Sequence, residues 1–313
     1  MAPVRALLAS PHLAVTISMM CFAGSFAVVK LVHTTVPPVW LNFWRTAVAL
    51  VVLLVVIGPA LRTIWPDIRR HWRFFLVAGF LLITAGNATL FVALHHTTVV
   101  NAGVINSLVP VVIVVVSWVF YADRLSLRQA VGVTLSLGGV LCLIARADID
   151  VLLGFAFNRG DIGMMVAVLS WALYAVMIKR GPPLSGATMQ LVLVTVGGLV
   201  TMAPWYAWEA ATVPAPPLDT TTLAAVAYLG LVTSAFASVL WTRAVQVLGP
   251  NRAAPYTHLM PVFAIAIGIL VLGEAFHLYH LGGLALIVVG IVLASVAPVR
   301  RAAVSPPGGA GDR

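Results

Sequence analysis

Charged side chains are scarce in this sequence, and acidic ones are the scarcest. Of its 313 residues, 61% are hydrophobic and only 9% are charged. Asp and Glu together number 9, against 18 Lys and Arg. Soluble globular domains contain about 25% charged and roughly 45 to 50% apolar residues. A water-soluble fold cannot hide this much apolar surface, so the sequence predicts a lipid bilayer as its main solvent.

Cysteine and recognisable catalytic motifs are also lacking. The two cysteines, Cys21 and Cys142, both lie within apolar segments, which excludes a disulfide framework and a metal site with ligand spacing. HExxH, GxSxG, paired intramembrane carboxylates and a nucleotide-binding motif are missing from the sequence. We therefore expect neither an enzyme nor a cofactor. The rings of charge or repeated filter segment of a channel are lacking as well.

The basic residues are distributed in a way that indicates orientation. The 18 Lys and Arg residues give a net charge of +9, but they fall between apolar runs instead of clustering, which argues against a nucleic-acid partner. Over alternate loops, fourteen lie on one side, three on the other (Lys30, Arg146 and Arg159), and Arg45 lies within a run. Because cytoplasmic loops carry the excess, we expect both termini in the cytoplasm and the protein in the cytoplasmic (inner) membrane.

Ten apolar runs predict the fold class. Each run is separated from the next by charge, Pro or Gly and is apolar on every face, which favours helices of about 20 residues over the alternating strands of a barrel. The predicted class is an all-α membrane protein with ten transmembrane helices. They span residues 12–32, 37–58, 74–94, 98–120, 128–145, 162–179, 187–207, 222–243, 253–272 and 279–297.

The chain contains an internal repeat. An offset of 151 positions places Pro110 on Pro261 and Asp123 on Glu274 without a gap. Two mid-span prolines and two span-terminal acids in one register are a stronger signal than matches of Ala or Gly, which are common in apolar helices. Since each half has five spans, an odd number, the second half must enter the membrane from the opposite side. The predicted arrangement is two inverted-topology five-helix repeats.

The repeat sets the expected domain organisation. An offset of 149 also aligns Lys30 with Lys179, so residues 1–150 are predicted to form the first repeat and 151–298 the second, followed by a disordered cytoplasmic tail over 299–313. Two similar halves of opposite orientation can expose one central site to each side of the membrane in turn. An ancient duplication without a transport role is the alternative.

Three segments carry a family pattern. They are FAGSFAVVK with Arg45 downstream, FVALHHTTVVNAGVINSLVPVV followed by ADRLSLRQ, and VLWTRAVQVLGPNRAAPYTHLMPVF followed by GILVLGE. Together they resemble the EamA-type families of the drug/metabolite transporter superfamily, which usually have Glu where this chain has Asp123. The resemblance implies ten helices, a central cavity between the halves, and export or exchange of amino acids, drugs or other metabolites.

Arg45 is the candidate for the centre of a substrate site. It lies about eight residues into the second predicted span, roughly 12 Å at 1.5 Å per residue. A buried guanidinium is costly unless it is paired or wet, so Arg45 is predicted to face a cavity. There it can bind a carboxylate or phosphate group, with Lys30 as a second donor. The alternatives are a structural role for Arg45 and a side chain that reaches the membrane surface for Lys30.

Polar and aromatic residues at similar depth complete the predicted site. They are Asn87, Asn106, Trp171, Tyr174 and Ser234. Pro110 and Pro261 add a backbone signal, because each removes a donor and frees a carbonyl one turn earlier, at Asn106 and at Thr257. Freed carbonyls are tolerated where backbone lines a cavity, although close helix packing is the alternative reading for each of these residues.

Several titratable residues lie outside this set. His95, His96 and His258 can change charge near neutral pH, so proton coupling is one option for the driving force. Asp123 and Glu274 lie at span ends, where a helix-end ion pair or a cap is favoured over a proton relay.

These features favour a secondary transporter as the function. We expect it to move a small metabolite across the membrane by alternating access, with an amino acid or related carboxylate as the preferred substrate and export as the direction. A gradient drives it, either of protons or of the substrate itself. The expected partners are the small-molecule substrate and the lipid bilayer. A drug or cation efflux carrier and a flippase for a lipid-linked intermediate are the alternatives.

Overall fold

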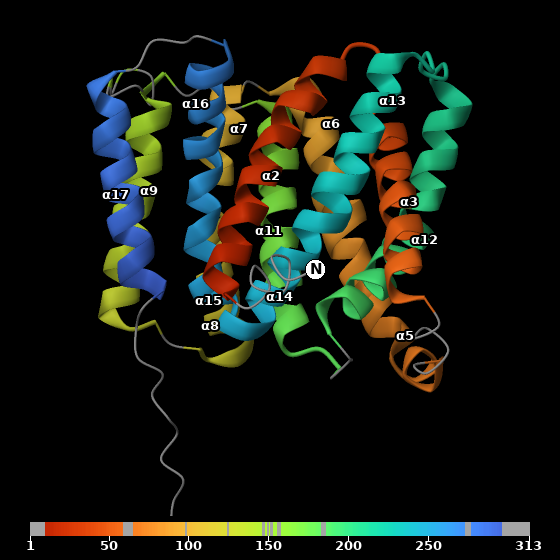
Figure 1. Ribbon diagram of the computed structural model, residues 1–313, viewed down its shortest axis with the longest axis horizontal. Coiled ribbons are helices and arrows are strands. Elements are labelled where there is room, and N and C mark those ends of the chain that lie inside the picture. The colour runs from red at the N-terminus through yellow and green to blue at the C-terminus, as the bar shows by residue number, and fades with distance from the viewer. Residues whose placement is uncertain are drawn as a thin grey trace, which may run out of the picture.

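Helices form all the regular structure of the described residues. The computed structural model describes residues 10–58, 65–97, 99–123, 125–145, 148, 150, 153–154, 158–182, 186–272 and 277–295. Within them every regular element is a helix (Figure 1), which confirms the predicted all-α class. Glu274 and the tail predicted over 299–313 lie outside the described residues.

Several of the long helices are built from consecutive segments. In chain order the segments are α2 (Pro11–Val32), α3 (Pro38–Ile57), α5 (Trp65–Gly79), the π-helix η1 (Phe80–Ala88), α6 (Thr89–His96), α7 (Val99–Asn106), α8 (Val109–Tyr121), α9 (Leu127–Ile144), α11 (Arg159–Lys179), α12 (Ala187–Thr212), α13 (Thr220–Ala227), the π-helix η2 (Tyr228–Ala237), α14 (Ser238–Leu248), α15 (Pro250–Ala253), the 3-10 helix η3 (Ala254–His258), α16 (Leu259–Leu272) and α17 (Leu278–Ser295).

Nine stretches of the described residues are long and apolar enough to cross a membrane. They match the first eight predicted spans and the tenth. The predicted ninth span, 253–272, is instead divided into the end of α15, the 3-10 helix η3 and the 14-residue α16, which is about 21 Å long at 1.5 Å per residue. The protein is therefore a multi-pass membrane protein, and the tenth crossing stays a prediction.

Local sequence signals fix where helices begin. Asn158 opens α11 with a capping box, in which its side chain accepts from the backbone N–H of Asp161 and the Asp161 carboxylate accepts from the backbone N–H of Asn158. Asp219 opens α13 by accepting from the backbone N–H of Thr222 at 2.8 Å. Hydrogen bonds from Thr222 lower the pKa of the Asp219 carboxyl from its ordinary value.

Two π-helices occupy matching places in the chain. η1 lies between α5 and α6, and η2 lies between α13 and α14. In each case the residue directly after the π-helix donates its hydroxyl to a carbonyl five residues earlier, from Thr89 to Thr84 and from Ser238 to Thr233. The two pairs are separated by 149 positions. The repeat therefore extends to a rare backbone feature that is frequent at functional sites.

Two helices are broken at matching positions as well. Ser107 and Leu108 form a turn between α7 and α8, and η3 precedes α16. Each break comes shortly before a mid-span proline, Pro110 or Pro261. His258, the last residue of η3, lies 2.9 Å through Nε2 from the carbonyl oxygen of Ser107, which is 151 positions away. The two broken helices thus meet at matched residues.

Glycines allow α9 and α17 to pack side by side (Figure 1). A Cβ atom added at Gly139 would lie 2.6 Å from the carbonyl oxygen of Gly283, and one at Gly132 would lie 2.6 Å from that of Gly290. The later residue of each helix faces the earlier residue of the other, so the helices are antiparallel. The offset of 151 matches Gly132 with Gly283 and Gly139 with Gly290. Replacing each glycine by its match therefore converts the contact between Gly139 and Gly283 into the contact between Gly290 and Gly132.

The outside of the bundle is apolar. Hydrophobic side chains such as Val55, Val119 and Leu281 are more than half exposed, which suits contact with lipid and is unusual over large areas of a soluble monomer. In Figure 1 the start of α2 and the end of α17 lie at the same, lower edge of the bundle.

Candidate functional site

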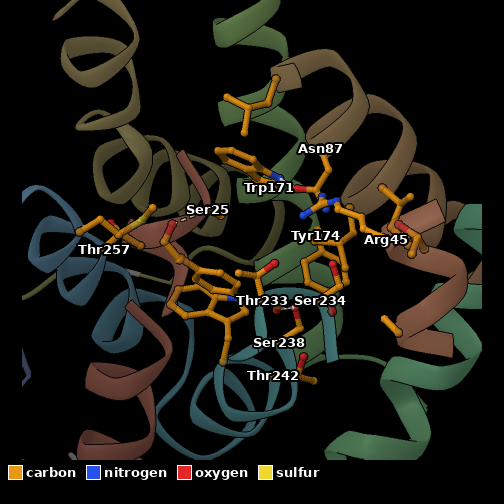
Figure 2. Close-up of a pocket in the computed structure, with 18 of the residues that line it drawn as sticks. Ser25, Arg45, Asn87, Trp171, Tyr174, Thr233, Ser234, Ser238, Thr242 and Thr257 are labelled. Carbon is orange, nitrogen blue, oxygen red and sulfur yellow. Dashed lines mark hydrogen bonds between the residues drawn. The ribbon is translucent and has the colours of Figure 1, made fainter. Parts of the chain in front are cut away.

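A cavity lies inside the bundle (Figure 2). Its volume is ≈ 150 Å³, of the order of an engineered protein cavity that takes up benzene. Its lining comes from α2, α3, η1, α6, α7 and α8 in the first half of the chain and from α11, α12, η2, α14, η3 and α16 in the second. The cavity therefore has room for a small organic molecule held by both halves.

Arg45 projects into the cavity from α3 and lies beside Asn87 and Tyr174 (Figure 2). Its side chain is buried, with 6% of its surface exposed. Nε donates to Oδ1 of Asn42 at 2.9 Å, and the guanidinium carbon lies 4.4 Å from the centroid of the Phe91 ring. The amide of Asn42 also donates to the Ile83 carbonyl at 3.1 Å. These contacts fix the guanidinium group at one wall of the cavity.

The charge of Arg45 has no carboxylate partner in the described part of the chain. Among the described residues, the ion pair of a Lys or Arg with a carboxylate is that of Arg180 with Asp123, and both of these side chains are partly exposed. Arg45 makes a single side-chain hydrogen bond, through Nε. A guanidinium has five N–H donors, so four remain, and a buried cation is costly until they are satisfied. A carboxylate fits such a fork of donors through two parallel hydrogen bonds.

Trp171 and Asn87 form a second fixed feature of the lining. The indole Nε1–H of Trp171, on α11, donates to Oδ1 of Asn87, on η1, at 3.1 Å. Gly86 permits this approach, because a Cβ atom there would lie 2.6 Å from Nε1 of Trp171. With its oxygen engaged by Trp171, the Asn87 amide still has the two donors of its NH₂ group.

Hydroxyl groups from η2, α14 and α11 line another part of the cavity. Figure 2 shows Thr233, Ser234, Ser238 and Thr242 close together below Tyr174. The hydroxyls of Tyr174 and Thr242 are buried and lie close enough to interact with one another, and neither has a well-aligned hydrogen bond to any described residue. Because an unsatisfied buried hydroxyl costs about 1 to 3 kcal/mol, these two groups retain hydrogen-bonding capacity next to the cavity.

Six of the seven predicted site residues line this cavity. They are Arg45, Asn87, Asn106, Trp171, Tyr174 and Ser234. Lys30 is the exception, because it is exposed in the last turn of α2 and takes no part in the lining. That the six residues bind a substrate stays a prediction.

The lining repeats between the two halves of the chain. Matched pairs that both line the cavity include Phe22 with Trp171, Ser25 with Tyr174 and Thr46 with Thr195 at an offset of 149, and Asn106 with Thr257 and Val109 with Met260 at an offset of 151. Applying the offset to Trp171 and Tyr174 would therefore have found Phe22 and Ser25 from the sequence, whereas Thr257 was already indicated by the carbonyl that Pro261 frees.

Two residues that hold Arg45 were missed by sequence reasoning. Asn42 lies three residues before Arg45 on the same helix, a spacing that places side chains together and is a usable signal. Phe91 lies on a different helix, and no local pattern links it to Arg45.

The titratable residues outside the cavity have other surroundings. Asp123 accepts from Nη2 of Arg180 at 3.1 and 3.2 Å, which confirms the expected ion pair at a helix end. His95 is exposed and packs edge-on against His33, with ring centroids 5.8 Å apart. Among the described residues, no group of three or more His, Cys, Asp or Glu side chains is arranged to hold a metal ion.

Comparison with known proteins places the chain among transporters. The model of the EamA-like transporter family matches residues 9–145 and again residues 158–296. The uncharacterized transporter YyaM of Bacillus subtilis is 24% identical over 256 residues, covering 80% of this chain and 82% of that protein. An uncharacterized transporter of Archaeoglobus fulgidus is 24% identical over 266 residues, covering 84% of this chain and 89% of that protein.

A solved crystal structure supports the fold. It matches with a TM-score of 0.71 at 20% sequence identity, over 92% of this chain and 96% of that chain. Since the family model covers most of the chain in two successive matches, this membrane protein belongs to the EamA-like transporter family.

Proposed function

We propose that the protein is a secondary transporter that exports a small carboxylate metabolite, such as an amino acid, across the cytoplasmic membrane. The observation that carries the proposal is the buried Arg45 guanidinium, which lines the cavity with four donors unused. An anion binding there offsets the cost of burying the charge, whereas a cation meets repulsion in a medium that screens it poorly. A carboxylate is therefore favoured over a cationic drug.

Alternating access between inverted halves is the proposed mechanism. It is supported by the contacts between α9 and α17, which map onto one another when the two helices are exchanged, and by the meeting of matched Ser107 and His258 at the two helix breaks. A pseudo-two-fold relation between halves of opposite orientation accounts for both observations. In this mechanism, ten spans form two five-helix repeats, with both termini on the arginine-rich, cytoplasmic side.

The experiment that tests the substrate class is a thermal-shift screen of the detergent-purified protein. The panel contains amino acids, organic acids, nucleosides, choline-like cations and drugs. A ligand selective for the folded protein at 100 times its Kd adds about 2.7 kcal/mol to the apparent stability. We expect a carboxylate to stabilise the wild type, and Arg45→Ala to weaken its binding about 100-fold, because two charge-assisted hydrogen bonds of about 1.5 kcal/mol each are lost.

Lys30→Ala is the matched control, because it removes a positive charge that lies outside the cavity. This variant should keep the ligand response, and in proteoliposomes it should transport the stabilising carboxylate as the wild type does, whereas Arg45→Ala should not. Stabilisation by cations or lipids alone, with no effect of Arg45→Ala, would instead point to drug efflux or to a flippase.

A further inference from the structure

We propose that His33 and His95 form a binding site for a divalent transition-metal ion such as Zn²⁺ at one edge of the bundle. His33 follows the last residue of α2, and His95 lies in the last turn of α6. Their ring centroids are 5.8 Å apart. The end of α2 lies at the upper edge of the bundle, opposite its start (Figure 1). Because His95 is exposed and His33 is partly exposed, an ion in water can reach both rings.

Hydrogen bonds set the same tautomer in both rings. Nδ1 of His33 lies 2.6 Å from the carbonyl oxygen of Lys30, and Nδ1 of His95 lies 2.9 Å from that of Phe91. A carbonyl oxygen can only accept, so each neutral ring has its proton on Nδ1 and keeps a lone pair on Nε2. Histidines that bind metals usually donate the other ring N–H to a carbonyl or carboxylate in this way, which fixes the ring for the metal.

The separation of the rings fits one shared ion. Bonds from Zn²⁺ to imidazole nitrogen are about 2.0 to 2.1 Å long, so two rings bound through Nε2 to one tetrahedral ion have centroids roughly 5 to 6 Å apart. The observed 5.8 Å falls in that range. Water completes the coordination, because among the described residues no third His, Cys, Asp or Glu side chain is arranged to join the pair. Imidazole ligands favour Zn²⁺, Cu²⁺ and Ni²⁺ over Mg²⁺ and Ca²⁺, which prefer oxygen.

A second histidine pair shows why the tautomer matters. His277 and His280, at the start of α17, also have ring centroids 5.8 Å apart. There the backbone N–H of His277 donates to Nδ1 of His280 at 3.1 Å. A backbone N–H can only donate, so the proton of the neutral His280 ring is on Nε2 and the lone pair on Nδ1 is engaged. The two pairs have equal ring separations, but only the tautomer of His33 and His95 presents a nitrogen lone pair to a metal ion from each ring.

Helix capping explains each histidine separately but not the pair. A histidine near a helix C-terminus can bond to a carbonyl of the last turn, and this role does not require its ring to meet a ring of another helix. The two helices both line the cavity, α2 through residues such as Phe26 and α6 through Phe91. An ion bound to both rings therefore ties two walls of the cavity together and favours the state in which the rings are close.

The test is isothermal titration calorimetry of the full-length, detergent-purified protein with Zn²⁺, using a preparation that carries no histidine tag. We expect one Zn²⁺ to bind per chain and Mg²⁺ not to bind at the same concentrations. His33→Ala and His95→Ala should each weaken Zn²⁺ binding by at least about 10-fold, because even the loss of a group that only orients a metal ligand costs about 10- to 100-fold in affinity.

His96→Ala and His280→Ala are the matched controls. His96 is exposed at the same helix end as His95, and His280 belongs to the pair whose proton position is the opposite one. Both control variants should bind Zn²⁺ as the wild type does. The proposal is overturned if the wild type binds no Zn²⁺, if either His33→Ala or His95→Ala leaves the affinity unchanged, or if a control variant loses as much affinity as these two.

Cu²⁺ gives a second measurement that needs no variant to fold. A site of two imidazoles should bind Cu²⁺ more tightly than Zn²⁺, and pulsed electron paramagnetic resonance of bound Cu²⁺ distinguishes one imidazole ligand from two. We expect two imidazoles on one ion in the wild type. A spectrum with a single imidazole or none would overturn the shared site. Neither measurement uses a transported solute, so the metal site and the substrate proposed for Arg45 succeed or fail independently.

Discussion

The two halves of the chain share a backbone pattern but differ in chemistry at the cavity. Ser25 and Tyr174 are matched and both line it. The Ser25 hydroxyl, however, donates to the Phe22 carbonyl in its own helix at 2.6 Å, whereas the Tyr174 hydroxyl has no well-aligned hydrogen bond to any described residue. Arg45 is matched by Val194, which is fully buried and outside the lining. The first half thus supplies the charge and the second supplies the unpartnered hydroxyls.

This difference separates two requirements of a carrier built from a repeat. Exchange of conformation between the halves depends on similar backbones, and the matched π-helices, helix breaks and glycine contacts meet that requirement. A small solute with distinct ends needs distinct groups around it, and identical lining from both halves would not provide them. Similarity is therefore expected in the framework and divergence in the lining.

The polar contacts at the starts of α2 and α11 provide the largest expected contrast. Asp161 is fully buried, and its carboxylate accepts from Oγ1 of Thr97 at 2.5 Å, Nδ2 of Asn101 at 3.1 Å and the backbone N–H of Asn158 at 2.8 Å. At an offset of 149, its match in the first half is His12.

His12 has fewer polar partners than Asp161. Its Nδ1 lies 2.6 Å from the hydroxyl of Tyr256 in a partly buried contact. Asp161→Ala leaves three donors without their acceptor and should destabilise the protein by about 3 kcal/mol or more, whereas His12→Ala should cost about 1 kcal/mol. Thermal unfolding of the two variants in one detergent measures the contrast. Equal losses would show that the starts of the two helices are equivalent in energy as well as position.

The glycine contacts between α9 and α17 test the opposite expectation, that the halves are equal. A Cβ atom at Gly139 would lie 2.6 Å from the Gly283 carbonyl oxygen, and one at its match Gly290 would lie 2.5 Å from that of Gly132. Gly139→Ala and Gly290→Ala should therefore destabilise the protein similarly, by about 1 to 3 kcal/mol through overpacking.

Gly138→Ala is the matched control, because a Cβ atom there has nothing within 4 Å. This change should be neutral or stabilise the helix by up to about 1 kcal/mol. Unfolding midpoints of the three variants decide the question. A large difference between Gly139→Ala and Gly290→Ala would mean that the two matched contacts contribute unequally to the stability of the protein.

The spans were predictable because the signal for them is local. Runs of apolar residues gave nine of the long helices, whereas the helix breaks just before Pro110 and Pro261 were not predicted, because both prolines were expected inside continuous spans. The π-helices and the 3-10 segment η3 were not predicted, since these depend on hydrogen-bond partners and packing that hydropathy does not report. This is why the ninth predicted span differs from the structure.

The site was predictable in part for a similar reason. Polar residues in mid-span, such as Asn87 and Asn106, are costly unless they face a cavity, so their placement follows from the bilayer. The prediction for Lys30 lacked this basis, because Lys30 lies at a helix end. A lysine there can reach the membrane surface without a partner, so it need not face a cavity. The contact between Arg45 and Phe91 joins separate helices, and only the three-dimensional packing reveals it.

The smallest expected change in stability concerns Ser25 and Tyr174, and it tests the lining directly. Tyr174→Phe removes a buried hydroxyl that has no well-aligned hydrogen bond in the described structure, so the protein without ligand should be as stable as the wild type or slightly more stable. Ser25→Ala removes a hydrogen bond within one helix and should cost no more than about 1 kcal/mol.

Ligand binding should separate these two variants. If the Tyr174 hydroxyl bonds to the carboxylate compound found in the thermal-shift screen, its loss should weaken binding about 10-fold, equivalent to about 1.4 kcal/mol, while Ser25→Ala should leave the affinity nearly unchanged. Thr242→Val removes the neighbouring unpartnered hydroxyl and should resemble Tyr174→Phe. A ligand whose affinity falls with Ser25→Ala and not with Tyr174→Phe would reverse the assignment, because the first half would then supply the hydroxyl as well as the charge.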